Sequence, residues 1–177
     1  MATAPSLQAA ADFTIRRVQP TIGAEIEGID LSRKLSAEQI AAIRAAVIEH
    51  KVVFFRDQPL DNESHAAFAA EFGPLYTHPS ARKDDNVHVV HAIAARDDFS
   101  EKPQILGLEL SENRELLAEI LRQYKRPEFQ ARFSWRPGTF AFWDNRATVH
   151  YAVKNYGDYP RKLHRILIAD EPLYGDL

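Results

Sequence analysis

Short stretches in which apolar and polar residues alternate predict most of the strands. Residues 13–18 and 24–29 alternate in this way and are separated by Pro20 and Gly23, so they should form a hairpin with one face in water. Residues 51–55 are largely apolar without alternation, which is typical of a strand buried on both faces. Further strands are predicted at residues 87–93, 129–135, 139–143, 149–153 and 161–169.

Three other segments repeat apolar residues at helical spacing. The first, residues 37–50, follows Ser36 and Gln39, which have the form of a capping box. The second is capped by Asp61 or Asn62 and ends at Gly73, where a left-handed residue commonly closes a helix. The third opens at Ser111, is closed by Pro127 and carries an apolar stripe of Leu116, Leu117, Ile120, Leu121 and Tyr124.

This order of elements predicts a mainly β protein with flanking helices, an α+β fold of the antiparallel jelly-roll type, or double-stranded β-helix. The strands do not alternate with helices in a βαβ rhythm, which argues against a doubly wound parallel sheet. The length of 177 residues suits one domain over residues 1–177, with the first ten residues as a loose tail.

Composition removes several classes of function. Basic residues do not form a stripe with interleaved aromatics, and the net charge is -3, so nucleic-acid binding has little support. There are no cysteines, which excludes disulfides, cysteine-ligated zinc and thiol catalysis and fits a reducing cytoplasm. No apolar run approaches the roughly 18 residues that a membrane span needs.

The residues that carry chemistry gather near the C-terminus. An apolar run at residues 140–143 leads into Asp144 and Asn145, which are turn formers, and His150 follows just past the turn. A histidine fixed at a strand edge is well placed to bind a metal. Further on, Arg161 and Arg165 share one face with leucines, which indicates either a core ion pair or an anion pocket.

Several motifs in order resemble one family. Residues 143–152, Trp-Asp-Asn-Arg-Ala-Thr-Val-His-Tyr-Ala, followed by Arg161 and Arg165, closely resemble the C-terminal motif of the taurine dioxygenase and alkylsulfatase group. These are iron(II)- and 2-oxoglutarate-dependent dioxygenases. Residues 22–31, 50–58 and 72–74, and the pair His78-Pro79, also stand in the order and approximate spacing of that family.

The resemblance implies roles for four residues. His150 would be the distal iron ligand, and Arg161 would hold the far carboxylate of 2-oxoglutarate. Arg165 and His78 would contact the anionic head of the substrate, a sulfonate, sulfate or carboxylate. Ala81 stands where the taurine enzyme has an aromatic hydroxyl, so a longer alkyl sulfate or sulfonate is at least as good a candidate as taurine.

One family motif is missing from the sequence. Non-haem oxygenases of this type hold iron with two histidines and one carboxylate, and the family supplies two of these ligands from a His-X-Asp motif. None of the 7 histidines is followed two places on by Asp or Glu, so only His150 carries over. The flanking motifs nearly meet, which predicts a junction near residues 94–104. Either a long central stretch was left out of the sequence as read, which the intact order of the flanking motifs favours, or the chain has a real deletion.

The implied reaction is oxidation of the carbon next to the sulfonate or sulfate of a small organosulfur compound. It would consume O2 and 2-oxoglutarate and release sulfite or sulfate, an aldehyde, succinate and CO2. Two alternatives stay open: a non-catalytic, anion-binding remnant of the jelly roll, and a dioxygenase that acts on a carboxylate such as an aryloxyacetate. A homo-oligomer is a further expectation from the family.

Overall fold

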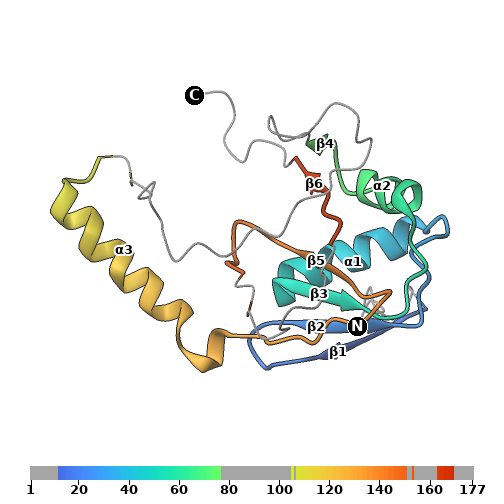
Figure 1. The fold of residues 1–177 in the computed structure, drawn as a ribbon, viewed down its shortest axis with the longest axis horizontal. Coiled ribbons are helices and arrows are strands. Elements are labelled where there is room, and N and C mark those ends of the chain that lie inside the picture. Colours follow the sequence, from blue (N-terminus) through green and yellow to red (C-terminus); the bar gives the residue numbers. More distant parts are fainter. Residues whose placement is uncertain (1–11, 77–104, 106, 151–152, 154–162, 170–177) are drawn as a thin grey trace, which may run out of the picture.

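The computed structural model describes residues 12–76, 105, 107–150, 153 and 163–169, and all structural statements concern these residues. Outside them lie the predicted tail at residues 1–10, the predicted strand at 87–93, the whole junction at 94–104, and the site candidates His78 and Arg161. Figure 1 shows a sheet with α1 and α2 close to it and α3 lying apart from it.

The main sheet has the strand order β1-β2-β3-β5. Strands β1 (Thr14–Arg17) and β2 (Ala24–Glu27) pair antiparallel, which confirms the predicted hairpin. Strand β3 (Val52–Phe55) pairs antiparallel with β5 (Phe140–Trp143).

One pair in this sheet differs from the antiparallel prediction. Strands β2 and β3 run parallel, because α1 (Ala37–His50) lies between them in sequence and carries the chain back to the starting edge. The sheet is therefore mixed, and with its flanking helices it is consistent with part of the predicted jelly roll.

The first two helices begin where their capping residues predict. The Ser36 hydroxyl accepts a hydrogen bond from the Gln39 amide, and the Gln39 side chain accepts one from the Ser36 amide. Asp61 rather than Asn62 caps α2 (Asn62–Ala70), since its carboxylate accepts from the Ser64 amide. Helix α1 thus has the predicted bounds of residues 37–50.

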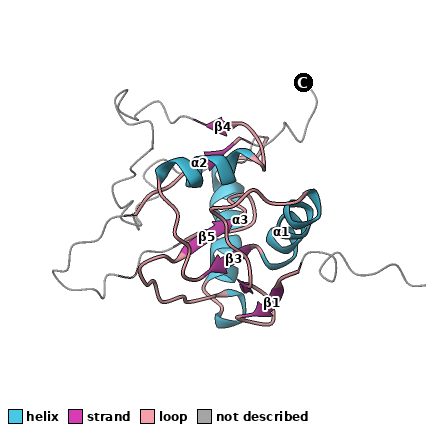
Figure 2. Cartoon of the chain, turned by 90° about the vertical axis from the view of Figure 1, so that its right-hand side faces the viewer, coloured by secondary structure: helices cyan, strands magenta, loops and turns pink. Residues whose placement is uncertain are grey.

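The hydrophobic core lies in the N-terminal part of the described chain. Among all the described residues, every buried apolar residue falls between Phe13 and Phe72, and the completely buried ones include Ile43, Val53 and Phe55. Figure 2 shows α1 and α2 at different edges of the view around the sheet, where their apolar residues join this core. The expected burial of the 51–55 segment is confirmed for Val53, Phe54 and Phe55.

The C-terminal part has less regular structure than predicted. Helix α3 (Leu110–Tyr124) starts one residue before Ser111, because the amide of Glu109 is capped by the Glu112 side chain. The predicted stripe is not a core, since Leu116 and Ile120 are exposed and Asn113 is the buried residue of this helix. None of the helices described is long and apolar enough to cross a bilayer.

Three predicted strands are absent or shorter in the described residues. The prediction of a strand at residues 129–135 is wrong. A 3-10 turn occupies Pro127–Phe129, and the Phe133 ring stacks on Phe54 while its backbone is not paired in a strand. Residues 149, 150 and 153 are not in a strand. Of residues 163–169, only β6 (Leu167–Ile168) is a strand, paired with the equally short β4 (Leu75–Tyr76).

Candidate active site

The two faces of the sheet have different surroundings. Side chains alternate along a strand, so Val53 and Phe55 face the helix-covered core while Phe54 faces the other way. The register places Val52 opposite Trp143 and Phe54 opposite Ala141. Trp143 therefore lies on the face opposite α1 and α2, and this face carries the candidate site.

A tight turn after β5 positions His150. The Asp144 carboxylate accepts hydrogen bonds from the backbone and guanidinium of Arg146, and these bonds lower the pKa of Asp144. The Thr148 hydroxyl donates to the Asp144 carbonyl at 2.7 Å, which closes the turn. The imidazole of His150 then lies against the Trp143 ring, with 5.4 Å between centroids. Asp144 thus serves the turn, in agreement with its predicted role.

Arg165 lies within electrostatic range of His150. Desolvation of the imidazole is the larger cause that lowers the pKa of His150, and the positive charge of Arg165 adds to it. A neutral imidazole is the form that can bind a metal. The Nε of Arg165 is buried and has no hydrogen-bond partner in the part of the chain that the structure describes. A buried donor without an acceptor is costly, so this atom marks a place that an anion can fill.

His164, the residue before Arg165, interacts electrostatically with His65 of α2. Burial is the larger cause that lowers the pKa of His65, and the charge of His164 lowers it further. The His65 ring also meets the edge of Phe140 at 5.1 Å. Sequence reasoning missed this contact. The one available signal is that His65 precedes the buried Phe68 by three residues and so shares its helix face.

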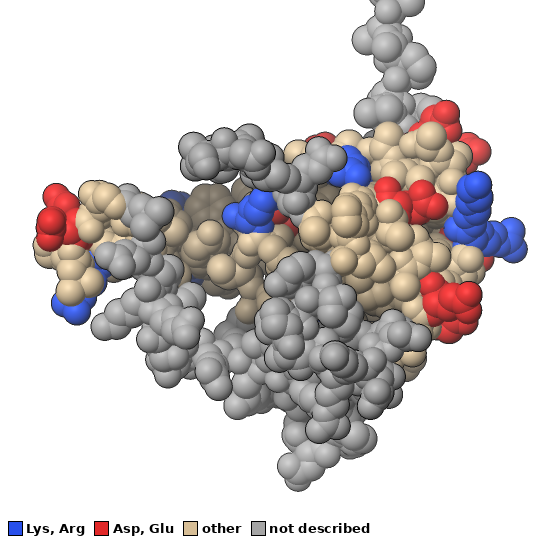
Figure 3. Space-filling view, turned by 90° about the horizontal axis from the view of Figure 1, so that it is seen from above, with Lys and Arg blue, Asp and Glu red and all other residues tan. Residues whose placement is uncertain are grey.

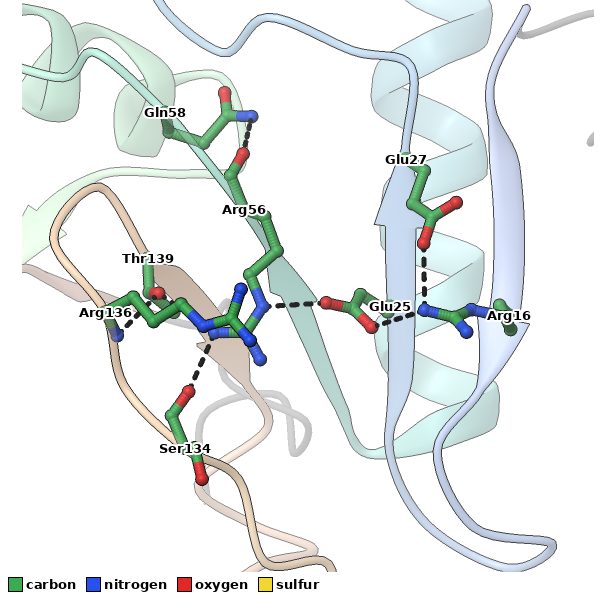
Figure 4. Close-up of polar contacts among 8 residues, drawn as sticks. All are labelled: Arg16, Glu25, Glu27, Arg56, Gln58, Ser134, Arg136 and Thr139. Carbon is green, nitrogen blue, oxygen red and sulfur yellow. Dashed lines mark hydrogen bonds and ion pairs between the residues drawn. The ribbon is translucent and has the colours of Figure 1, made fainter.

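A polar cluster on the site-bearing face attaches the C-terminal chain to the sheet. Arg56 donates to the Glu25 carboxylate at 2.8 Å, to the Ser134 carbonyl at 2.7 Å and to the Thr139 hydroxyl at 3.2 Å. Its guanidinium also lies 3.9 Å from the centre of the Phe133 ring. Figure 4 shows Arg56 at the centre of this cluster, between β2 and the segment that precedes β5. The cluster fixes the approach of the chain to β5, which ends at Trp143.

Comparison with known proteins identifies the family. The model described as taurine catabolism dioxygenase TauD, TfdA family matches residues 14–105 and 99–167. The chain belongs to this family. The predicted class of iron(II)- and 2-oxoglutarate-dependent dioxygenase is thereby confirmed at the level of the family.

Two curated relatives carry informative names within the TauD, TfdA family. The chain is 24% identical to an alpha-ketoglutarate-dependent sulfate ester dioxygenase of Pseudomonas putida, over 97% of this chain and 93% of that protein. It is 23% identical to an alkylsulfatase of Acinetobacter baylyi, over 91% of this chain and 86% of that protein. Among solved structures, a taurine dioxygenase from Burkholderia xenovorans has a TM-score of 0.68 at 23% identity, covering 88% of this chain and 87% of that one. The last likeness shows the fold.

The alignments also show a difference in length. The first alignment has 283 positions and the chain has 177 residues, so at least 106 positions (283 minus 177) have no residue of this chain. The TauD, TfdA model matches in two segments that overlap at residues 99–105. The junction near residues 94–104 stays a prediction, because it lies outside the described residues.

The described residues do not make up the iron centre of the TauD, TfdA family. That centre needs two histidines and a carboxylate on one side of the metal. The described residues hold no group of three or more metal-ligating side chains, and Asp144, the acidic residue nearest to His150 in sequence, is engaged by Arg146. His150 is the one predicted metal ligand, and it lies within the described residues. The anion side of the site fits better, because Arg165 offers a buried donor beside it.

Proposed function

We propose that the protein oxidises the carbon next to the sulfate or sulfonate group of a small organosulfur compound. 2-Oxoglutarate and O2 are the co-substrates, and the products are sulfite or sulfate, an aldehyde, succinate and CO2. The unpaired, buried Nε of Arg165 beside His150 carries this proposal, because it is a cation prepared for an anion next to a metal-ligand position. Iron(II) is the metal expected for the family.

The proposed roles follow the chemistry of each side chain. Arg165 holds the anionic head of the substrate, since a guanidinium presents planar donors that match sulfate, sulfonate or carboxylate. Arg161 holds the far carboxylate of 2-oxoglutarate, and His78 assists with the substrate head. His150 is a metal ligand, and Trp143 limits the position of its ring through their contact.

Sulfate esters are the substrate class that we favour. Relatives that cover most of the chain are named for sulfate esters and alkyl sulfates, whereas a 38% identical 2,4-dichlorophenoxyacetate dioxygenase of Cupriavidus pinatubonensis aligns over 33% of the chain. Ala81 leaves out the hydroxyl expected of a taurine enzyme. We therefore rank medium-chain alkyl sulfates before taurine and before aryloxyacetates.

A second candidate is supported by the missing His-X-Asp motif. A chain with one family metal ligand and an intact arginine pair would act as a non-catalytic anion-binding protein. It would bind 2-oxoglutarate or sulfate esters without converting them. This candidate requires that the central segment is a real deletion.

A substrate panel tests the proposal. The purified protein is incubated with iron(II), ascorbate, 2-oxoglutarate and one of hexyl sulfate, taurine or 2,4-dichlorophenoxyacetate, and succinate is measured. We expect the largest rise in succinate with hexyl sulfate, and its loss in Arg165→Gln. Succinate that rises most with the aryloxyacetate would overturn the substrate class. Binding of 2-oxoglutarate without any succinate would favour the second candidate.

The proposal also includes the cellular location and the oligomeric state of the protein. A cytoplasmic location is expected from the absence of cysteine in the sequence, and a homo-oligomer is expected from the family. On the face drawn in Figure 3, the acidic and basic side chains of the described residues are interspersed.

A further inference from the structure

Helix α3 carries apolar side chains that are exposed to water. Leu116 is 43% exposed and Ile120 is 39% exposed, although both belong to the stripe of apolar residues at helical spacing. Figure 1 shows α3 apart from the sheet and from α1 and α2. A helix of 15 residues is marginal in water by itself, because most helical stability in proteins comes from packing of the apolar face. The exposed part of the stripe is therefore a surface that a partner can cover.

The other part of the stripe is covered by the chain itself. Asn113 is buried, and its side-chain oxygen accepts a hydrogen bond from the Ile105 amide at 2.8 Å. Leu117 lies on the Asn113 side of the helix and is half-buried. Leu116 and Ile120 form the open edge of the stripe. Because they are four residues apart, they lie one above the other along the helix.

The two ends of α3 carry opposite charge. Residues 109–116 have a net charge of -2, from three Glu and one Arg, and residues 119–126 have +2, from two Arg, one Lys and one Glu. Two copies of α3 that pack antiparallel therefore place the acidic end of each beside the basic end of the other. Their opposed helix dipoles also attract. A parallel pair would place like charges side by side.

We propose that α3 is a self-association surface, on which a second copy of this chain packs its own α3 antiparallel, with Leu116 of one copy against Ile120 of the other. A two-fold axis beside Ala118 gives this arrangement, and a two-fold contact is the commonest one between identical chains. The inference rests on the proposed homo-oligomer but not on turnover. One helix face is small beside the roughly 1,600 Å² that a stable interface buries, so we expect a dimer that dissociates in the micromolar range.

Sedimentation velocity of the full chain, over a concentration series from low to high micromolar, tests the proposal. The wild type should shift from monomer to dimer. Leu116→Glu should raise the dissociation constant at least about tenfold, because the dimer would bury an unpaired charge. Ala118→Glu is the matched control. Ala118 is exposed and lies about 200° around the helix from Leu116, so this change should leave the dissociation constant within about twofold.

Introduced cysteines test the direction of the pairing, because the natural sequence has none. An equal mixture of Leu116→Cys and Ile120→Cys should form more disulfide-linked dimer than either variant alone. Leu110→Cys should form little. Antiparallel pairing would hold its two copies about 24 Å apart along the helix axis, whereas a disulfide joins Cα atoms at most about 7 Å apart.

Three outcomes would overturn the proposal: a chain that is monomeric over the whole series, a dimer that Leu116→Glu leaves intact, and ready cross-linking of Leu110→Cys, which would mean a parallel pair. Circular dichroism verifies that each variant keeps its helices. A monomer that still forms succinate would contradict this interface and leave the proposed reaction standing. A dimer without succinate would do the reverse.

Discussion

The N-terminal part of this chain supplies most of its buried core, whereas the C-terminal part carries the candidate site. Residues 12–76 contain the buried apolar residues of the described structure and both helices that begin as predicted. Residues 105–169 have few strands and several exposed apolar side chains, yet they carry His150 and Arg165. The difference teaches that the buried core and the candidate site belong to separate halves, which are joined by the pairing of β3 with β5 and by the packing of Phe140 and Phe142 on the core.

The largest effect should come from the core of the N-terminal half. Phe55 is completely buried and packs against Phe68 and Phe140. Phe55→Ala should lower the free energy of unfolding by about 3–5 kcal/mol, because it leaves a cavity. The matched control is Phe129→Ala at an exposed site of the C-terminal half, with an expected cost of about 0.5 kcal/mol. Urea denaturation measures both, and equal losses would refute the contrast.

The next effect concerns the contacts that join the halves. Arg56→Gln removes the ion pair with Glu25, the bond to the Ser134 carbonyl and the guanidinium over Phe133. We expect a loss of about 2–3 kcal/mol, since polar groups that are partly buried lose their partners. Arg16→Gln on the same face is the control. Its side chain is 66% exposed, so its pairs with Glu25 and Glu27 should contribute at most about 1 kcal/mol.

A smaller effect is expected where β6 meets the end of α2. Gly73 has φ 152°, and a Cβ there would lie 3.0 Å from Ile168 Cγ2 and 3.1 Å from the Ala169 carbonyl. Gly73→Ala should cost about 1–2 kcal/mol from backbone strain, with more from the displaced strand. Gly107→Ala has a similar backbone cost but open space around its Cβ. Thermal unfolding measures both variants. A larger loss of stability in Gly107→Ala than in Gly73→Ala would contradict the close packing of Gly73 against Ile168 and Ala169.

The smallest effect is a dependence on pH in the N-terminal half. His50 is buried, and desolvation lowers its pKa, with Arg17 and Lys51 acting in the same direction and Glu49 against them. The folded chain then binds this proton less readily than the unfolded chain. Stability should therefore fall as the pH drops through the ordinary histidine value of about 6.5.

Urea midpoints between pH 7.5 and 5.5 test this sign, in a range above the titration of the carboxylates. His50→Gln should make the profile less steep without flattening it, because burial also lowers the pKa of His65 and the pKa of His150. His164→Gln, at an exposed position, should leave most of it unchanged. A wild-type protein that becomes more stable on acidification in this range would show that the sign is wrong.

Sequence alone predicted the elements whose causes are local. The Ser36 and Gln39 capping pair lies at the start of α1, and the Asp144 turn was predicted from the turn chemistry of its side chain. By contrast, residues 129–135 alternate like a strand, but Phe133 is used to stack on Phe54. That outcome depends on a contact between distant parts of the chain, which periodicity does not encode.

In the candidate site too, local motifs were predictable from sequence and interactions between distant residues were not. Resemblance placed His150 and Arg165 in one site, and the structure brings their charges within range of each other. His65 and His164 lie far apart in sequence, so no local pattern predicted that the charge of His164 would lower the pKa of His65. His78 and Arg161 lie outside the described residues and stay predictions.

The most direct test of the proposed function is to measure succinate and inorganic sulfate in one reaction with iron(II), 2-oxoglutarate and hexyl sulfate. The proposed function predicts equimolar release of the two products, with both lost in Arg165→Gln and in His150→Ala. Succinate without sulfate, or neither product from a folded protein that binds 2-oxoglutarate, would contradict it.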